Sequence, residues 1–244
     1  MSRSVDLLKK RYLENIKEKP DLFVGVELEY PVVNLEGKAT DIEVVKELFR
    51  YLSSVLKFTV ERVDDFGNPI QLLDPVSQDT ILFEVAYTTV EFAFGRAKSI
   101  QEVEERFRDY MDLIQKKLGE TNHAIVGSGI HPYWEKNENQ PVAYPRYQML
   151  MNYLKLSRTL PGMDLHDYPR YGAFICGSQV QLDVSKSNYL RVINVFTQIE
   201  AAKAYLFANS VFSEAEWDTK VSRDIFWEKS MHGIYPENVG VNAR

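Results

Sequence analysis

The stretch VGVELEYPVVN, residues 24–34, alternates between apolar and polar positions with a period of two. Successive side chains of a β-strand point to opposite faces of a sheet, so this period predicts a strand over Phe23–Val33. The apolar face would carry Val26, Leu28, Tyr30 and Val32, and the polar face Gly25, Glu27 and Glu29. Because glutamate is disfavoured in strands, two glutamates on one face need a chemical explanation.

Three further segments show the same alternation, at Ile81–Tyr87, Thr88–Phe94 and Ser178–Val184. Antiparallel sheets commonly have one face on the core and one face in water. The apolar faces would include Phe83, Phe92, Val180, Leu182 and Val184, and the polar faces Glu84, Glu91, Gln179, Gln181 and Asp183. We therefore expect an α+β fold in which helices cover the apolar side of an antiparallel sheet.

Four helices are predicted from apolar residues that recur at spacings of three and four. The first lies within residues 1–19, and the others run roughly from Asp41 to Leu56, from Ser99 to Leu118 and from Ser187 to Phe207. Ser99 suits an N-cap position, because its hydroxyl can accept a hydrogen bond from a free backbone N–H. In the last helix, the stripe that we expect to face the core is Val192, Phe196, Ile199, Ala202 and Leu206.

The composition is that of an ordinary globular chain, with 244 residues, 45% hydrophobic and 26% charged. No linker or repeat divides the sequence, so we expect residues 1–244 to form one domain. A net charge of −6 disfavours binding to nucleic acid or to anionic membranes. There is no apolar run long enough to span a bilayer and no signal peptide, and the single cysteine, Cys176, suits a reducing compartment. The expected location is the cytoplasm.

The acids and amides on the polar strand faces predict a metal site. If the four strands pair in one sheet, their polar faces bring together seven acidic or amide positions and no cation. Like charges opposite each other across strands repel, and a hard divalent cation such as Mg²⁺ would neutralise them. Zinc is less suited, because the four histidines show no paired-ligand spacing. The alternative is a plain solvated sheet face, which is common for acidic residues.

A series of motifs resembles the glutamate–cysteine ligase family, in its plant-type form. The stretch VGVELEYPVVN resembles the family's first strand, VEFAF (90–94) its Glu-bearing strand, and GSQVQLDVS (177–185) a later strand. Four more segments follow the family pattern in order: GSGIHPYW (127–134), YPRYQMLMNYL (144–154), AYLFANSVF (204–212) and SRDIFWEKSMHG (222–233). The resemblance covers most of the chain.

The resemblance implies a fold related to glutamine synthetase, with an antiparallel sheet curled into a funnel. It implies an ATP-dependent ligase of glutathione biosynthesis, with Mg²⁺ as the metal and Mn²⁺ as the alternative. Such a ligase phosphorylates the γ-carboxylate of glutamate, and the amine of cysteine then attacks the acyl phosphate. Family members are longer, so we expect this chain to lack the family's C-terminal part. The alternatives are a carboxylate–amine ligase with another amine acceptor and a non-catalytic fragment that binds nucleotide or metal.

The resemblance also assigns roles to individual residues. Its metal-ligand positions fall on Glu27, Glu29, Glu84, Glu91 and Gln179, and its cofactor-binding positions on Gln179 and Gln181. Arg223 falls on an arginine that binds substrate and takes part in catalysis, and Arg146 is a second expected substrate-binding residue. Two simpler readings stay open: Arg223 could pair with Asp224 or Glu228 at the surface, and Arg146 could simply begin a helix after Pro145.

Overall fold

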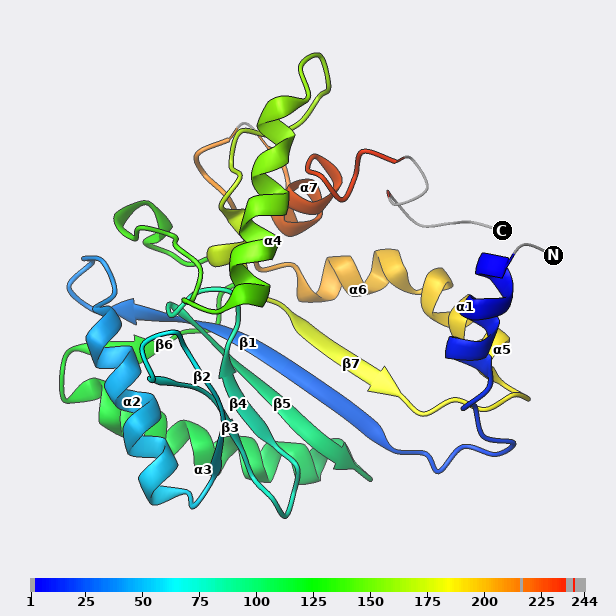
Figure 1. Ribbon diagram of the computed structural model, residues 1–244, viewed down its shortest axis with the longest axis horizontal. Coiled ribbons are helices and arrows are strands. Elements are labelled where there is room, and N and C mark those ends of the chain that lie inside the picture. The colour runs from blue at the N-terminus through cyan, green and yellow to red at the C-terminus, as the bar shows by residue number, and fades with distance from the viewer. Residues whose placement is uncertain (1–2, 216, 236–238, 240–244) are drawn as a thin grey trace.

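Strand β1 (Val24–Asn34) is the centre of the fold and has partners on both sides. The structure, a computed structural model, describes residues 3–215, 217–235 and 239. β1 pairs with β5 (Thr89–Ala97) along one edge and with β7 (Ser178–Leu182) along the other, and its last residues pair with β6 (His123–Ile125). Figure 1 shows β1, β5 and β7 lying side by side across the middle of the molecule. The alternating stretch that predicts this strand is therefore the element on which the sheet is built.

The sheet has seven strands, is antiparallel throughout and is not closed. Beyond β5 it continues through β4 (Thr80–Phe83) and β3 (Pro69–Leu73) to β2 (Thr59–Val63). The strand expected over Ile81–Tyr87 ends early, because Val85 has a positive φ of 58° and the chain turns back into β5. The predicted α+β class, an antiparallel sheet with helices on it, is confirmed.

Helices α2 (Ile42–Val55) and α3 (Ile100–Gly119) pack on the sheet and on each other. Both begin at side-chain N-caps: Asp41 accepts from the N–H of Glu43, and Ser99 from the N–H of Glu102. Their apolar stripes bury Leu48, Phe49, Ile114 and Leu118 against strand residues such as Phe83 and Phe92. The rings of Phe49 and Phe83 stack with centroids 3.8 Å apart.

The apolar core continues beyond the sheet into a region rich in aromatic rings. This region involves α4 (Pro145–Lys155), α7 (Ser222–Glu228) and three short 3₁₀ turns at Trp134–Lys136, Leu156–Thr159 and Tyr171–Ala173. Phe226 of α7 is fully buried and has Tyr171, Phe212 and Trp217 as ring neighbours. This packing fixes the start of α7, which matters for the site described below.

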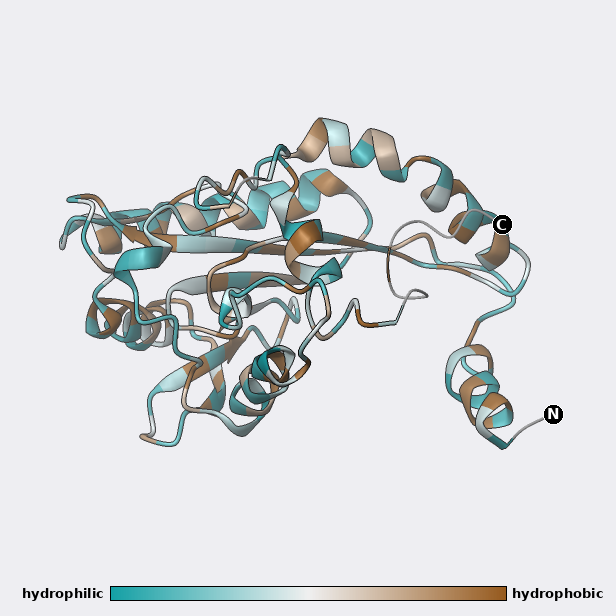
Figure 2. Cartoon of the chain, turned by 90° about the horizontal axis from the view of Figure 1, so that it is seen from above, coloured by the Kyte–Doolittle hydropathy of each residue, from teal (hydrophilic) through white to brown (hydrophobic). Residues whose placement is uncertain are grey.

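The helix expected over residues 187–207 consists of two helices, α5 (Tyr189–Gln198) and α6 (Glu200–Phe207), and it does not face the core. Neither helix has a buried residue, and Leu206 of the expected core stripe is 71% exposed. Figure 2 shows these helices standing apart along one edge of the molecule, with hydrophobic residues along them. The expectation of a core face was wrong, because amphipathic spacing does not reveal whether a helix has a partner.

The apolar side of β7 is also exposed, which corrects the expectation for Val180 and Leu182. Val180 is 56% exposed and Leu182 is 42% exposed. β7 pairs with β1 alone, so it is an edge strand, and none of the major helix contacts reaches it. The alternation in this segment predicts the strand correctly but does not identify a covered face.

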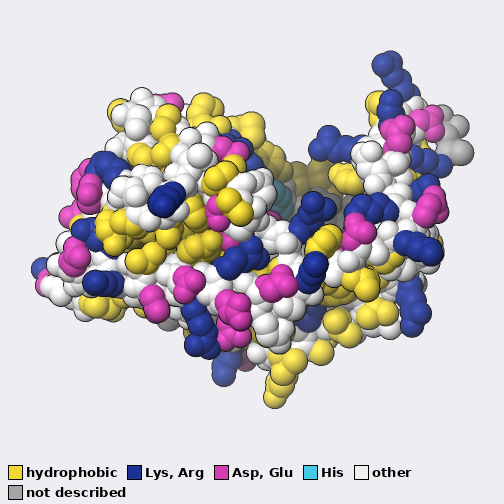
Figure 3. Space-filling model, turned by 90° about the horizontal axis from the view of Figure 1, so that it is seen from below, with side chains coloured by type: hydrophobic (Ala, Val, Ile, Leu, Met, Phe, Trp, Pro, Cys, Tyr) yellow, Lys and Arg dark blue, Asp and Glu magenta, His cyan; other side chains and the backbone are white. Residues whose placement is uncertain are grey.

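The N-terminal helix α1 (Arg3–Leu13) stands away from the body of the molecule, as Figure 2 shows, and has no buried residues. The helix has a net positive charge, with four basic residues against Asp6. Figure 3 shows many Lys and Arg side chains at this end of the molecule and a hollow between it and the rest. None of the helices in the described residues combines the length and the apolar character needed to cross a membrane.

The contrast between buried and exposed apolar positions predicts two different mutational costs. Phe49→Ala should lower the free energy of unfolding by about 3–5 kcal/mol, because it leaves a cavity opposite Phe83. Val180→Ala, on the open strand, should cost less than about 1 kcal/mol. Urea unfolding followed by circular dichroism measures both values, and equal costs would contradict the burial described here.

Candidate active site

The register of the sheet brings the predicted glutamates together. Glu29 of β1 lies opposite Glu91 of β5, and Glu27 lies opposite Gln179 of β7. Glu84 directly follows β4, and its N–H donates to the carbonyl oxygen of Thr89, which leads into β5. Three neighbouring strands therefore supply the four carboxylates that the sequence places on polar faces. We call Glu27, Glu29, Glu84 and Glu91 the glutamate cluster.

Burial, with repulsion from neighbouring carboxylates, makes three carboxyl groups of this cluster hard to ionise: Glu29, Glu84 and Glu91. Glu91 is only 9% exposed. Its burial, together with the negative charge of Glu84, raises the pKa of Glu91 well above its ordinary value. Burial also raises the pKa of Glu84, although the hydrogen bond with Glu91 works against that rise. Two carboxyl groups joined in this way share one proton, as like-charged groups at short range must.

Glu29 is held by the backbone of the segment that leads into β7. The N–H of Gly177 donates to Oε2 of Glu29 at 2.6 Å, and the N–H of Glu29 donates to the carbonyl oxygen of Gly177 at 2.9 Å. Burial and the charge of Glu84 nevertheless raise the pKa of Glu29 to about 7, while the positive charge of Arg223 acts in the opposite direction. Glu29 is therefore close to its titration point at neutral pH.

Two arginines face the glutamate cluster from different helices. Arg146, in the first turn of α4, lowers the pKa of Glu84 through its positive charge. Arg223, in the first turn of α7, acts in the same way on Glu29. No salt bridge joins Arg223 to Asp224 or Glu228 among the described residues, although the charge of Arg223 opposes the rise that burial causes in the pKa of Asp224. Arg146 does follow a proline at the start of a helix, but it also faces the cluster.

The polar residues of β7 contribute unequally. Gln179 lies opposite Glu27, at the edge of the cluster, and Gln181 lies opposite Gly25. Asp183 does not join the cluster, because its carboxylate accepts a hydrogen bond from the N–H of Asp21, in the loop before β1. The expected polar face thus contains Gln179 and Gln181 but not Asp183.

The glutamate cluster has the donor chemistry of a cation site but no finished coordination cage. Among the described residues, no three His, Cys, Asp or Glu side chains are arranged to surround one metal ion. Instead, Glu84 and Glu91 hydrogen-bond to each other. Buried carboxylates without full compensation are costly, so the site is electrostatically prepared for positive charge.

Two residues near the cluster lie inside the quoted motifs, but the motifs assign them no role. Tyr147, next to Arg146 in α4, donates from its hydroxyl to the carbonyl oxygen of Phe83 at 2.8 Å, and this hydroxyl lies 3.5 Å from Oε2 of Glu84. Gly177 contacts Glu29 through its backbone, a role that residue type alone does not predict. The position of Gly177, just before an amide-bearing strand, is the only hint in the sequence.

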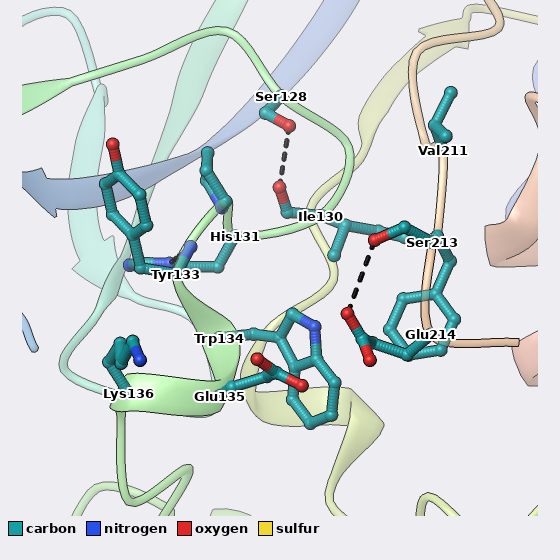
Figure 4. A pocket seen from close by; sticks show the side chains of 12 residues that line it. Ser128, Ile130, His131, Tyr133, Trp134, Glu135, Lys136, Val211, Ser213 and Glu214 are labelled. Atoms are coloured by element: carbon teal, nitrogen blue, oxygen red, sulfur yellow. Dashed lines mark hydrogen bonds between the residues drawn. The ribbon is translucent and has the colours of Figure 1, made fainter. Parts of the chain in front are cut away.

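A separate cavity of about 300 Å³ lies away from the glutamate cluster. It is lined by residues 128–136 and 211–214, among them Trp134, Glu135 and Glu214 (Figure 4). His131 lies in its wall and is fully buried, with Nε2 2.9 Å from the carbonyl oxygen of Val32. This contact gives His131 a structural role, and burial lowers the pKa of its imidazole.

The raised carboxyl pKa values predict that stability falls as pH rises. In the unfolded chain these groups titrate near 4.5, so above that pH the folded chain retains protons that the unfolded chain has lost. The free energy of unfolding should therefore fall from pH 4.5 through about 7 and beyond. Glu91→Gln removes one of these groups. In metal-free buffer near pH 8, the variant should melt at least about 3 °C above the wild type.

The difference in stability between the variant and the wild type separates the contribution of the glutamate cluster from that of the histidines. Buried His131 and His166 have lowered pKa values, which give the opposite pH dependence at acid pH in both proteins. Glu61→Gln, an exposed strand position outside the cluster, serves as the control. If Glu91→Gln and wild type lost stability in parallel from pH 5 to pH 9, the electrostatic account of the cluster would be wrong.

The comparisons with known proteins agree with the motifs. No curated protein matches the sequence. A family model described as glutamate-cysteine ligase family 2 matches residues 23–233, a span that begins just before β1 and includes the glutamate cluster and both arginines. The match covers well over half of the chain, and so the chain belongs to glutamate-cysteine ligase family 2.

Proposed function

We propose that this protein joins glutamate to cysteine through a γ-glutamyl amide bond, using ATP. The observation that carries the proposal is the convergence of one buried glutamate, three partly buried glutamates and two arginines from β1, β5, the end of β4 and two helices. Membership of a ligase family supports the same reaction class. No role in folding explains why four like-charged side chains lie together beside the core.

The chemistry requires an activated carboxyl group, because a free carboxylate does not react with an amine at neutral pH. The γ-carboxylate oxygen of glutamate attacks the terminal phosphorus of ATP, and the bond to the ADP oxygen breaks. The amine nitrogen then attacks the acyl carbon of the γ-glutamyl phosphate, inorganic phosphate leaves, and the nitrogen loses a proton. Catalysis of phosphoryl transfer depends mainly on positioning and on compensation of charge.

The donor set of the cluster fits Mg²⁺ or Mn²⁺. Both ions prefer carboxylate and amide oxygens, and Mg²⁺ commonly needs only one or two carboxylates because it keeps waters and binds substrate phosphates. Glu27, Glu29, Glu84 and Glu91 would hold the metal, with Gln179 at the edge of the site. When bound, the metal would supply positive charge that compensates the negative charge of the phosphoryl group being transferred. The protons that burial keeps on the cluster would leave as positive charge arrives.

The arginines and amides supply the remaining contacts. A guanidinium group binds a carboxylate or a phosphoryl group through two parallel hydrogen bonds. Arg223 would hold the acid substrate beside Glu29, and Arg146 would compensate charge near Glu84. The exposed amides of Gln179 and Gln181 would contact the nucleotide from β7. Such alignment supplies much of the rate gain in reactions that join two bound molecules.

A coupled assay of ADP release tests the reaction. With Mg²⁺, ATP and glutamate, cysteine should give the fastest release among a panel of amino acids and simple amines. A different preferred amine would instead assign a carboxylate–amine ligase with another acceptor. Stabilisation by Mg²⁺–ATP without turnover would assign a nucleotide-binding protein, because any ligand of the native state raises its melting temperature. No stabilisation and no turnover would refute both.

Substitutions in the cluster should separate function from folding. Glu27→Gln should reduce turnover by at least about 100-fold and weaken the response to Mg²⁺, because a neutral amide is a poorer cation ligand. Its melting temperature should stay within about 3 °C of the wild type. Glu61→Gln, on strand β2 and outside the cluster, is the matched control and should keep its activity. Near-normal turnover of Glu27→Gln would refute the metal-ligand role.

A further inference from the structure

Gly177 lies where the guanidinium group of Arg223 packs against the chain. A Cβ atom added at Gly177 would be 2.4 Å from Nη2 of Arg223, 2.7 Å from Cζ and 2.8 Å from Nη1. Real Cβ atoms do not come within 3.0 Å of other heavy atoms, so any other residue would push the guanidinium away. The absence of a side chain at this position is therefore a condition for the observed place of Arg223.

The same glycine also fixes Glu29. Its N–H donates to Oε2 of Glu29, and its carbonyl oxygen accepts from the N–H of Glu29. Gly177 thus contacts a carboxylate of the cluster through its backbone and a guanidinium through its bare Cα. The positive charge of Arg223 acts on Glu29 across this residue.

Arg223 keeps hydrogen-bonding capacity for a ligand. Its Nε atom is buried and has no hydrogen-bond partner among the described residues. An arginine side chain has five N–H donors in a rigid plane, and unsatisfied buried donors are costly. A planar anionic group, such as a carboxylate, would satisfy them.

A second glycine of the sheet repeats the arrangement. A Cβ atom at Gly25 of β1 would be 2.9 Å from Oε1 of Gln181 on β7. Here too, a long polar side chain of the site lies close to backbone that carries no side chain. At both glycines, the lack of a side chain leaves room for a long polar side chain of the site.

We propose that Gly177 is a positioning residue of the site: it lets the Arg223 guanidinium lie beside Glu29, where it receives a carboxylate of the acid substrate. This inference rests on the proposed ligase function. It assigns to Gly177 no contact with the substrate itself. The role is spatial, because a methyl group at this position would move Arg223 and leave the other groups in place.

Gly177→Ala should fold normally, which makes the test feasible. The backbone of Gly177 does not have the positive φ that would strain another residue. The atoms that its Cβ would meet belong to the far end of a flexible side chain, which can swing aside. We expect a change in melting temperature of less than about 3 °C. Gly127→Ala, at an exposed glycine with open space around it, is the matched control.

The first readout is a split between the two substrates. Gly177→Ala should raise the KM for glutamate by at least about tenfold, because a shift of about 1 Å in a positioning group is costly. The KM for ATP should change by less than about twofold, since Arg223 is not assigned to the nucleotide. Gly127→Ala should match the wild type in both. An unchanged KM for glutamate in Gly177→Ala overturns the proposal.

A double-mutant cycle tests whether the effect acts through Arg223. Arg223→Lys replaces the planar fork by a slender ammonium group, which leaves room for a methyl group at residue 177. In the Arg223→Lys background, Gly177→Ala should change the KM for glutamate by less than about twofold. An equal effect of Gly177→Ala in both backgrounds would mean that the glycine acts in another way, and would overturn the proposal even if the single variant were destabilised.

The position of Arg223 can also be read without substrate. Phenylglyoxal modifies accessible arginines, and peptide mass mapping follows each one separately. Modification of Arg223 should be at least about threefold faster in Gly177→Ala than in wild type or Gly127→Ala, because a displaced guanidinium group is more exposed. Equal rates overturn the proposal. If the wild type shows no turnover, both the ligase function and the positioning role that rests on it are overturned. The modification rates separate this result from a wrong assignment of the contact between Gly177 and Arg223, because they are measured without substrate.

Discussion

Repulsion between buried carboxylates is the constraint around which the rest of the site is organised. Glu29 and Glu91 lie opposite each other on paired strands, and Glu84 shares a hydrogen bond with Glu91. Burial is the main cause that raises the pKa values of these groups, and neighbouring negative charges add to the rise, so without a cation the groups tend to keep protons. Arg146 and Arg223 provide only part of the compensation, from the first turns of their helices. The negative charge that remains uncompensated would attract the metal ion of a metal–nucleotide complex.

The fold supplies the rigidity that such a site needs. β1 is paired along both edges, and β5 beside it and β4 beyond carry Phe92 and Phe83 into the buried core. The region of aromatic rings beyond the sheet fixes α7 and hence the base of Arg223. Charged groups held by well-packed elements cannot easily relax away from one another, so their interaction is preserved for binding. The loss of folding stability that this repulsion causes is confined to the glutamate cluster.

The sequence predicts the α+β class, the N-cap at Ser99 and the glutamates that share a face, because periodicity and capping are local properties. Their convergence follows from strand pairing, which the alternation only suggests. What the sequence does not reveal is set by partners distant along the chain. The helix over 187–207 is amphipathic but lacks a surface to cover, and β7 alternates although one edge and both faces are open. The role of Gly177 depends on Arg223, which lies 46 residues further on.

The open edge of β7 affects which part of the sheet opens first in local unfolding. Within the described residues, β7 has one pairing partner and no extensive helix packing, so it gives up its hydrogen bonds at a lower free energy than the strands within the sheet. Amide exchange with solvent should therefore proceed first along 178–182, while β1 and β5 remain closed. The strand that holds Gln179 would therefore open before the paired strands that hold Glu29 and Glu91.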